Sequence, residues 1–137
     1  MIQDYLGRIG RFAAVEVKEL RDRDDAGASA PRIIDREGED ILSRVGADPF
    51  LIALDERGRE LDSIKLARLI EKQQLAGTRQ ITFVIGGPNG LSEAVRERAA
   101  LVLALSKMTL THELARVVLL EQIYRAFTII HSLPYQK

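Results

Sequence analysis

Short apolar runs alternate along this chain with segments of helical periodicity, and that alternation limits the fold more than any other feature. The clearest apolar runs cover residues 50–54, 81–85 and 101–105. Runs of about five apolar residues are typical of strands that are buried on both faces of a sheet. Strands separated in this way by helices predict a parallel sheet with helices on both faces, which is an α/β fold.

The segments between these runs have the apolar spacing and the end signals of helices. Helices are expected over residues 2–13, 31–45, 62–76 and 111–130, with a shorter helix after Ser92. Residues 14–20 alternate in polarity like a half-exposed strand, and loops are expected at residues 21–28 and 55–60. The run 101–105 could instead continue the helix before it, but residues 106–109 interrupt the run and favour a strand.

Composition limits the possible functions further. The 137 residues predict one domain, and a hydrophobic content of 46% excludes a disordered tail. The chain has no cysteine, which excludes a disulfide scaffold, a thiolate metal site and thiol catalysis, and no metal site is expected. Residues 114–130 form a long apolar stretch with three charged side chains, so a membrane span is not expected. No secretory signal is recognisable, and the expected location is cytoplasmic.

The loop 85–92, Ile-Gly-Gly-Pro-Asn-Gly-Leu-Ser, is the most informative local pattern. Glycines directly after a buried strand let a backbone approach a ligand closely. The loop is not a Walker A motif, since no Lys-Ser or Lys-Thr follows its last glycine, and its spacing is not G-x-G-x-x-G. A tight turn that enters a helix explains the same residues equally well.

A second loop, residues 105–110, also joins a predicted strand to a predicted helix. In open α/β sheets, ligands bind outside the carboxyl ends of the strands. If the three strands are neighbours, Leu54, Gly86 and Leu105 line one crevice. Otherwise Leu54 and Leu105 are ordinary core residues.

The last predicted helix is apolar almost all round, which predicts burial on several sides and suggests a partner subunit. His112 begins this helix and could act as a base, contact a phosphate or take part in capping. Arg116 and Arg125 do not share one face of the helix. The chain has 20 basic and 20 acidic residues, but from Lys107 onward it is mildly basic, which permits an RNA partner without requiring one.

Three ordered motifs resemble the large-subunit ribosomal RNA methyltransferase H family, which is a SPOUT-class methyltransferase family. Residues 83–92 match its I-G-G-P-x-G-L-S signature, and residues 105–112 match its L-S-x-x-T-L-x-H segment. Residues 114–127 match its L-x-R-x-x-x-x-E-Q-x-Y-R-A-F/W helix, and residues 35–39 and 54–55 match weaker upstream blocks. The resemblance covers essentially the whole chain and implies a single domain over residues 1–137.

The resemblance implies an S-adenosylmethionine-dependent methyltransferase that works as a homodimer on large-subunit RNA in the ribosome. Its C-terminal part, about residues 80–137, is expected to form a deep trefoil knot, a topology that general rules of chain connection disfavour. The implied substrate atom is N3 of pseudouridine 1915 in helix 69 of the 23S RNA. The implied cofactor-binding residues are Leu54, Gly86, Leu105, Ser106, Lys107, Met108, Thr109 and Leu110.

Catalysis in such an enzyme needs in-line positioning and removal of the weakly acidic N3 proton, and a nearby Arg or His could stabilise the anion. The candidate catalytic residues are His112, Arg116, Arg125 and Tyr135. The family tail reads H-P-Y-H-R, whereas this chain has Gln136 and Lys137 at the last two positions, and Lys lacks the fork of Arg. This departure leaves open a second possibility, in which the protein is a non-catalytic knotted module that binds RNA or the ribosome. A generic α/β domain with a small regulatory ligand is a third possibility.

A parallel sheet normally begins with a strand, yet this chain opens on a predicted helix. Members of the family typically have an apolar strand and a loop before the helix that starts here at Ile2. The expected difference in length before this helix is therefore one strand of about 5–6 residues and its connection. We therefore expect the usual first strand to be lacking, through truncation or a misassigned start, with one sheet position empty or filled by other means.

Overall fold

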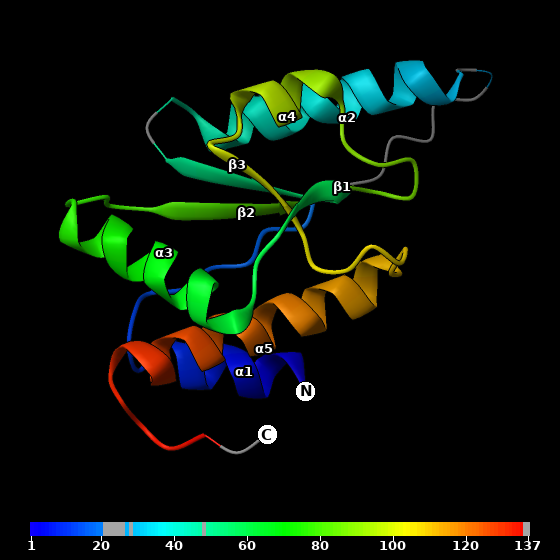
Figure 1. Cartoon of the computed structure of the whole chain (residues 1–137). Helices are drawn as coiled ribbons and strands as arrows, with labels where there is room; N and C mark the ends of the chain where they lie inside the picture. Colours follow the sequence, from blue (N-terminus) through cyan, green and yellow to red (C-terminus); the bar gives the residue numbers. More distant parts are fainter. Residues whose placement is uncertain (21–26, 28, 48, 136–137) are drawn as a thin grey trace.

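Three parallel strands form the sheet of this protein, whose computed structural model describes residues 1–20, 27, 29–47 and 49–135. The strands are β1 (Phe50–Glu60), β2 (Ile81–Ile85) and β3 (Leu101–Ala104), and their order is β2-β1-β3 (Figure 1). The predicted strands and their parallel arrangement are confirmed. Because residues 101–104 form a strand, the alternative of a continued helix is wrong.

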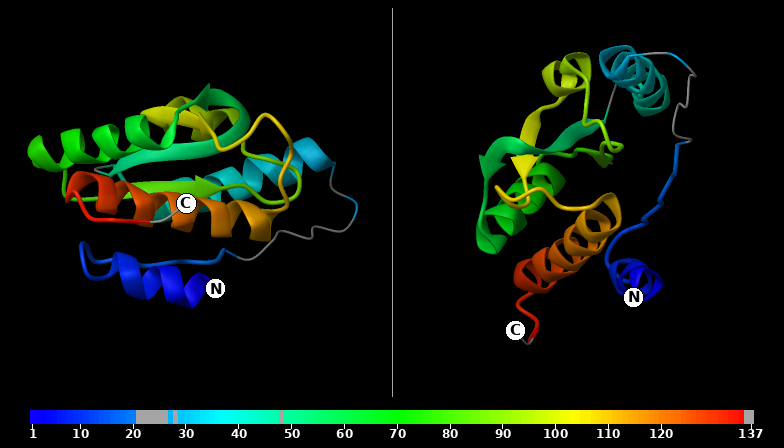
Figure 2. Two further views of the ribbon diagram at one scale, coloured as in Figure 1. Left: turned by 60° about the horizontal axis from the view of Figure 1, so that its bottom comes forward. Right: turned by 90° about the vertical axis from the view of Figure 1, so that its right-hand side faces the viewer.

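Helices cover both faces of the sheet, as predicted. They are α1 (Ile2–Ile9), α2 (Ala30–Val45), α3 (Ser63–Leu75), α4 (Glu93–Arg98) and α5 (His112–Ile130). The helices α1, α3 and α5 lie on one side, and α2 and α4 lie on the other (Figures 1 and 2). None of the helices in the described part of the chain is long and apolar enough to cross a membrane.

Side-chain caps begin three of these helices. Asp62, Ser92 and Thr111 each accept a hydrogen bond from the backbone N–H three residues later, at 2.7–3.2 Å. Each cap satisfies an amide that the first helical turn leaves without a partner, and contributes about 1 kcal/mol. The caps fix where α3, α4 and α5 begin, and so fix the lengths of the loops at the strand ends.

The larger core lies between the sheet and the three helices α1, α3 and α5. Residues 51–53 of β1 are fully buried, and burial of each large aliphatic side chain contributes about 1.5–3 kcal/mol. Both α3 and α1 pack against α5, and Phe12 stacks on Phe127 with ring centres 5.4 Å apart. The predicted burial of the last helix on several sides is confirmed, and α1 of the same chain covers one of those sides.

The strand β1 is longer than predicted. It continues through residues 55–60, which were expected to form a loop, and pairs again with β3 after an irregularity. Both Leu54 and Arg59 are in register with Leu103, so the residues between them form a bulge. A Cβ atom at Gly58 would lie 2.6 Å from the carbonyl oxygen of Val102, so only glycine fits here.

Residues 14–20 do not form the strand that their alternation predicts. Within the described residues, no backbone group of this segment makes a backbone hydrogen bond. The segment connects α1 toward α2 along the side of the molecule (Figure 2). Alternation in polarity does not make a strand without a partner strand, and no strand among the described residues pairs with this segment. The predicted loop 21–28 lies outside the described residues, apart from Gly27.

Candidate functional site

The carboxyl ends of the strands meet at one edge of the sheet. Leu54 of β1 is in register with Ile85 of β2 on one side and with Leu103 of β3 on the other. Gly86 directly follows β2, and Leu105 directly follows β3. The condition for a shared crevice, that the three strands are neighbours, is therefore met.

The glycine-rich loop after β2 is a tight turn that enters α4. Gly90 N–H donates to Gly87 O at 2.9 Å, and Gly90 has a φ of +89°. A Cβ atom at Gly86 would lie 2.9 Å from the carbonyl carbon of Gly90 and 3.0 Å from Leu91 Cγ. The turn weighed from sequence is thus present. The turn packs against Gly86 and leaves no space for a side chain at this position.

The loop after β3 is tied to the bulge of β1. Ser106 Oγ accepts from Met108 N–H at 2.9 Å, and the Thr109 hydroxyl donates to the carboxylate of Glu56. Lys107 lies 3.6 Å from a carboxylate oxygen of Glu60 in an exposed ion pair. The loop 105–110 is therefore positioned by two acidic residues of β1 that sequence reasoning assigned to a loop without a role.

Asp55, at the start of the bulge, is a second anchor of this edge. Its side chain is 8% exposed, and Asp55 Oδ2 lies 2.8 Å from Arg57 Nη2 and 3.7 Å from Arg96 Nη1. The hydrogen bond from Arg57 lowers the pKa of the Asp55 carboxyl below its usual range. Arg96 also donates to Leu91 O at 2.9 Å, which links the bulge to the glycine-rich loop. Sequence reasoning missed Arg96, because nothing local pairs it with Asp55.

His112 and Arg116 lie together at the start of α5, beside Gly86. His112 Nδ1 is 3.1 Å from Gly86 O, and Arg116 Nη2 is 3.2 Å from His112 Nε2. A carbonyl only accepts and a guanidinium only donates, so these partners assign the proton to Nδ1 and leave Nε2 as the acceptor. In this arrangement His112 is a neutral ring that orients Arg116. Arg116 Nη1 also pairs with Glu19 Oε1 at 2.6 Å.

Arg125 and Tyr135 lie near the other end of α5, around Glu121. Glu121 Oε2 accepts from Arg125 Nη2 at 2.7 Å and from the Tyr135 hydroxyl at 3.0 Å. Burial and hydrogen bonding with Tyr5 and Glu121 raise the pKa of the Tyr135 phenol above its usual range. Arg125 lies nine positions after Arg116 on α5, which is about 14 Å along the axis. The four predicted catalytic residues therefore form two clusters within one chain.

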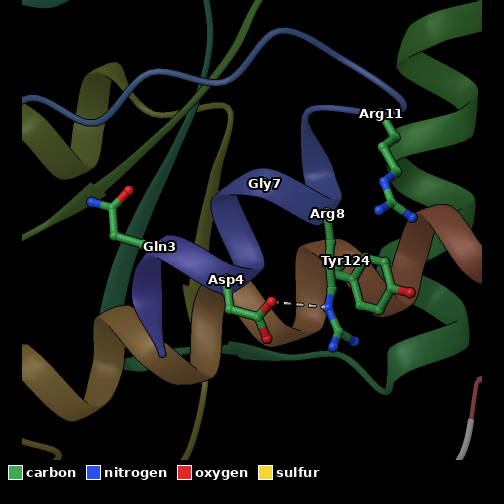
Figure 3. Close-up of a pocket in the computed structure, with 6 residues that line it drawn as sticks. All are labelled: Gln3, Asp4, Gly7, Arg8, Arg11 and Tyr124. Atoms are coloured by element: carbon green, nitrogen blue, oxygen red, sulfur yellow. Dashed lines mark hydrogen bonds and ion pairs between the residues drawn. The ribbon is translucent and has the colours of Figure 1, made fainter.

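The described residues line a hollow away from this edge and a larger one that reaches it. The smaller one is lined by Gln3, Asp4, Gly7, Arg8, Arg11 and Tyr124 (Figure 3). There Arg8 pairs with Asp4 at 3.4 Å, and its guanidinium carbon lies 5.5 Å from the centre of the Tyr124 ring. None of the residues predicted for catalysis or cofactor binding lines it. A much larger cavity, of about 1190 Å³, lies between residues 13–20, α2 and β2 and reaches the His112 cluster. Gln136 and Lys137 are outside the described residues.

Comparison with known proteins assigns the chain to a family. The family model described as "Predicted SPOUT methyltransferase" matches residues 1–136. A protein of Trichlorobacter lovleyi named "Ribosomal RNA large subunit methyltransferase H" is 48% identical over 134 residues, which are 98% of this chain and 86% of that protein. A protein of the same name from Syntrophotalea carbinolica is 45% identical over 132 residues, which are 96% of this chain and 85% of that protein. Another from Carboxydothermus hydrogenoformans is 42% identical over 140 residues, with 99% of this chain and 88% of that protein covered. The chain thus belongs to the SPOUT methyltransferase family, among relatives named ribosomal RNA large subunit methyltransferase H.

Proposed function

We propose that this protein transfers the methyl group of S-adenosylmethionine to large-subunit ribosomal RNA, at N3 of a pseudouridine in helix 69. The family supplies the methyl transfer, and the names of the relatives supply the RNA. The observation that carries the proposal is the meeting of three strand ends and two tied loops beside His112 and Arg116.

The residues at this edge fit the proposed cofactor. Leu54 and Leu105 offer apolar surface, and Gly86 offers a backbone without a side chain. The loop from Leu105 through Ser106, Lys107, Met108 and Thr109 to Leu110 would supply backbone amides and carbonyls together with Leu110. When bound, the cofactor supplies a sulfonium methyl group that needs no further activation. The cofactor carries no phosphate, so the absence of a Walker A lysine agrees with it.

We assign the stabilisation of the substrate anion to Arg116. A uridine-type N3–H must lose its proton, here to solvent water, before nitrogen can take a methyl group, and the negative charge that remains needs a fixed cation. Arg116 is 21% exposed, and His112 holds its guanidinium while Gly86 O holds His112. His112 therefore acts by orienting Arg116.

The remaining features of the proposal follow from the family. We propose a homodimer of single-domain chains in the cytoplasm, with a trefoil knot in residues 80–137. In support of the knot, the start of α5 lies against the loop after β2, where His112 Nδ1 is 3.1 Å from Gly86 O. In support of a partner subunit, Leu114 on the first turns of α5 is 49% exposed.

Calorimetric titration with S-adenosylmethionine tests the cofactor site. The wild-type protein should bind, and Gly86→Ala should bind at least tenfold more weakly, because the new Cβ displaces the turn at Gly90. Gly7→Ala is the matched control, since nothing lies within 4 Å of a Cβ there. Absence of binding to the folded wild-type protein would favour a non-catalytic RNA- or ribosome-binding module, which the changed tail residues Gln136 and Lys137 first suggested.

A further inference from the structure

The short helix α4 carries two arginines whose side chains reach opposite ends of the buried part of β1. Arg96 Nη1 lies 3.7 Å from Asp55 Oδ2, and Asp55 directly follows the buried residues 51–54 of β1. Arg98 Nη2 donates at 3.0–3.2 Å to three backbone carbonyls that precede β1, those of Gly46, Ala47 and Pro49. Of the two arginines, Arg96 therefore contacts the edge where the strand ends meet.

Arg96 also holds the end of the glycine-rich loop. Its Nη1 donates to Leu91 O at 2.9 Å. Leu91 is 4% exposed and directly follows Gly90, whose backbone packs against Gly86. One guanidinium nitrogen thus contacts a carbonyl of this loop and a carboxylate of the bulge in β1, so Arg96 joins the loop to the bulge.

The carboxylate of Asp55 is a fixed partner for Arg96. Asp55 Oδ1 accepts from Arg57 N–H at 2.8 Å and from Arg57 Nε at 3.0 Å, and Asp55 Oδ2 accepts from Arg57 Nη2 at 2.8 Å. A two-pronged pair of this kind, with an added backbone bond, defines the orientation of both groups. The Asp55 side chain is therefore oriented from within the bulge and offers α4 an attachment point.

The residue after Asp55 reaches the other loop of the proposed cofactor site. The Glu56 carboxylate accepts a hydrogen bond from the Thr109 hydroxyl. The bulge itself is held at both ends, because β1 is in register with Leu103 of β3 before and after it. Bulges next to functional sites commonly redirect side chains. Adjacent side chains of one bulge thus hold the loop after β3 directly and the loop after β2 through Arg96.

We propose that the bulge of β1 sets the spacing between the two loops of the proposed cofactor site, with Arg96 and Glu56 as its positioning residues. Both act through a loop, Arg96 through the carbonyl of Leu91 and Glu56 through the hydroxyl of Thr109. A ligand that contacts both loops binds more tightly when their spacing is fixed before it arrives. The inference rests on the proposed function, because these loops are the ones proposed to bind S-adenosylmethionine.

Hydrogen exchange of the full chain without cofactor tests whether Arg96 orders the glycine-rich loop. The reporter is the amide of Gly90, which donates to Gly87 O at 2.9 Å. Arg96→Gln keeps a polar side chain but removes the guanidinium, and it should make this amide exchange at least fivefold faster. Arg98→Gln is the matched control on the same helix, and it should lower the urea midpoint of unfolding while leaving exchange at Gly90 unchanged.

Two exchange results would overturn this role. One is equal exchange at Gly90 in the wild-type protein and in Arg96→Gln. The other is equal acceleration by Arg96→Gln and Arg98→Gln, which would indicate a general loosening of the fold. Neither cofactor nor RNA enters this assay, so it still decides the role of Arg96 in the loop if the folded wild-type protein fails to bind S-adenosylmethionine and the proposed function is wrong.

Calorimetric titration with S-adenosylmethionine tests the consequence for binding. Arg96→Gln should weaken binding at least fivefold, whereas Arg98→Gln should stay within twofold of the wild-type protein. Arg96→Lys keeps the positive charge and a donor, so its affinity should lie between those of the wild-type protein and Arg96→Gln, and it serves as the test if Arg96→Gln does not fold. Unchanged affinity in the Arg96 variants, with a wild-type protein that binds, would contradict the positioning role.

A double variant tests the coupling through the bulge. Glu56→Gln should weaken cofactor binding at least threefold. Combining it with Arg96→Gln should weaken binding by less than the product of the two single effects, because the spacing of the loops is already lost when one attachment is removed. Effects that multiply fully would show that the two loops act independently and would contradict the coupling.

Discussion

The two ends of α5 carry similar residue types in different settings. At the first turns, Arg116 lies beside the strand ends and is held by His112, which is itself held by the carbonyl of Gly86. Nearer the other end, Arg125 and Tyr135 both donate hydrogen bonds to Glu121. The first arginine is held by the ring of His112 and by the exposed carboxylate of Glu19, whereas the second is paired with a partly buried carboxylate on the same helix.

This difference indicates that Arg116, and not Arg125, is available to stabilise a substrate anion. The side chains of Arg125 and Glu121 are 23% and 20% exposed. They lie four residues apart on α5, and an ion pair at this spacing mainly stabilises the helix. The only acidic partner that the structure shows for Arg116 within the described residues is Glu19, which is 68% exposed and lies on the unpaired segment before residue 20. We therefore expect the first cluster to affect turnover and the second to affect stability.

Removing the guanidinium of Arg116 should have the largest effect. Arg116→Ala is expected to lower kcat by about 10²–10³-fold, as for loss of one donor to a developing anion, with the fold retained. Methyl transfer under single-turnover conditions measures it. Arg68→Ala, an exposed arginine on α3 paired with Glu71, is the matched control and should leave kcat unchanged. Loss of activity in both variants would contradict a specific role.

Removing the ring of His112 should have an intermediate effect. His112→Ala is expected to lower kcat by about tenfold, because Arg116 remains but is no longer held, and a small misplacement of a catalytic group is costly. His112→Gln, which keeps one donor and one acceptor, should restore part of the loss. A loss as large as that of Arg116→Ala, together with a lost pH dependence of kcat, would make His112 the general base instead.

Removing the hydroxyl of Tyr135 should have the smallest effect on turnover. Tyr135→Phe is expected to keep kcat within about twofold and to lower the free energy of unfolding by about 1 kcal/mol, the value of one hydrogen bond. Because the folded-state pKa of Tyr135 is raised, the unfolded chain loses the proton first as pH rises. Wild-type stability should therefore fall above about pH 10, and less so in Tyr135→Phe, as urea titrations at several pH values would show. A kcat loss like that of Arg116→Ala would bring the second cluster into the reaction.

Much of this fold follows from local patterns. Five-residue apolar runs predicted the strands, and helical spacing with end signals predicted the helices that Asp62 and Ser92 cap. These signals act within a few residues of each other. The parallel direction of the strands followed from the alternation of strands and helices. Their order, which brings the strand ends at Leu54 and Ile85 together, did not.

Other features depend on contacts between distant residues. The second half of β1 is polar and looks like a loop, but Gly58 lets it approach Val102 closely enough to pair again with β3. Residues 14–20 have the alternation of a strand but pair with no strand in the described part of the chain. The bond between Arg96 and Asp55 spans two elements, and no local spacing reports it. Sequence motifs singled out His112 and Arg116, but only the structure shows one orienting the other.

We propose that the strand ends hold the cofactor and that Arg116 stabilises the RNA anion that takes the methyl group. The most direct measurement incubates the protein with methyl-labelled S-adenosylmethionine and large ribosomal subunits that lack the modification, followed by mass spectrometry of the digested RNA. We expect one labelled methyl group per RNA, on the N3 of a pseudouridine in helix 69, and at least a hundredfold slower labelling by Arg116→Ala. A folded protein that binds the cofactor and leaves the RNA unlabelled, or that labels it equally well without Arg116, would contradict this mechanism.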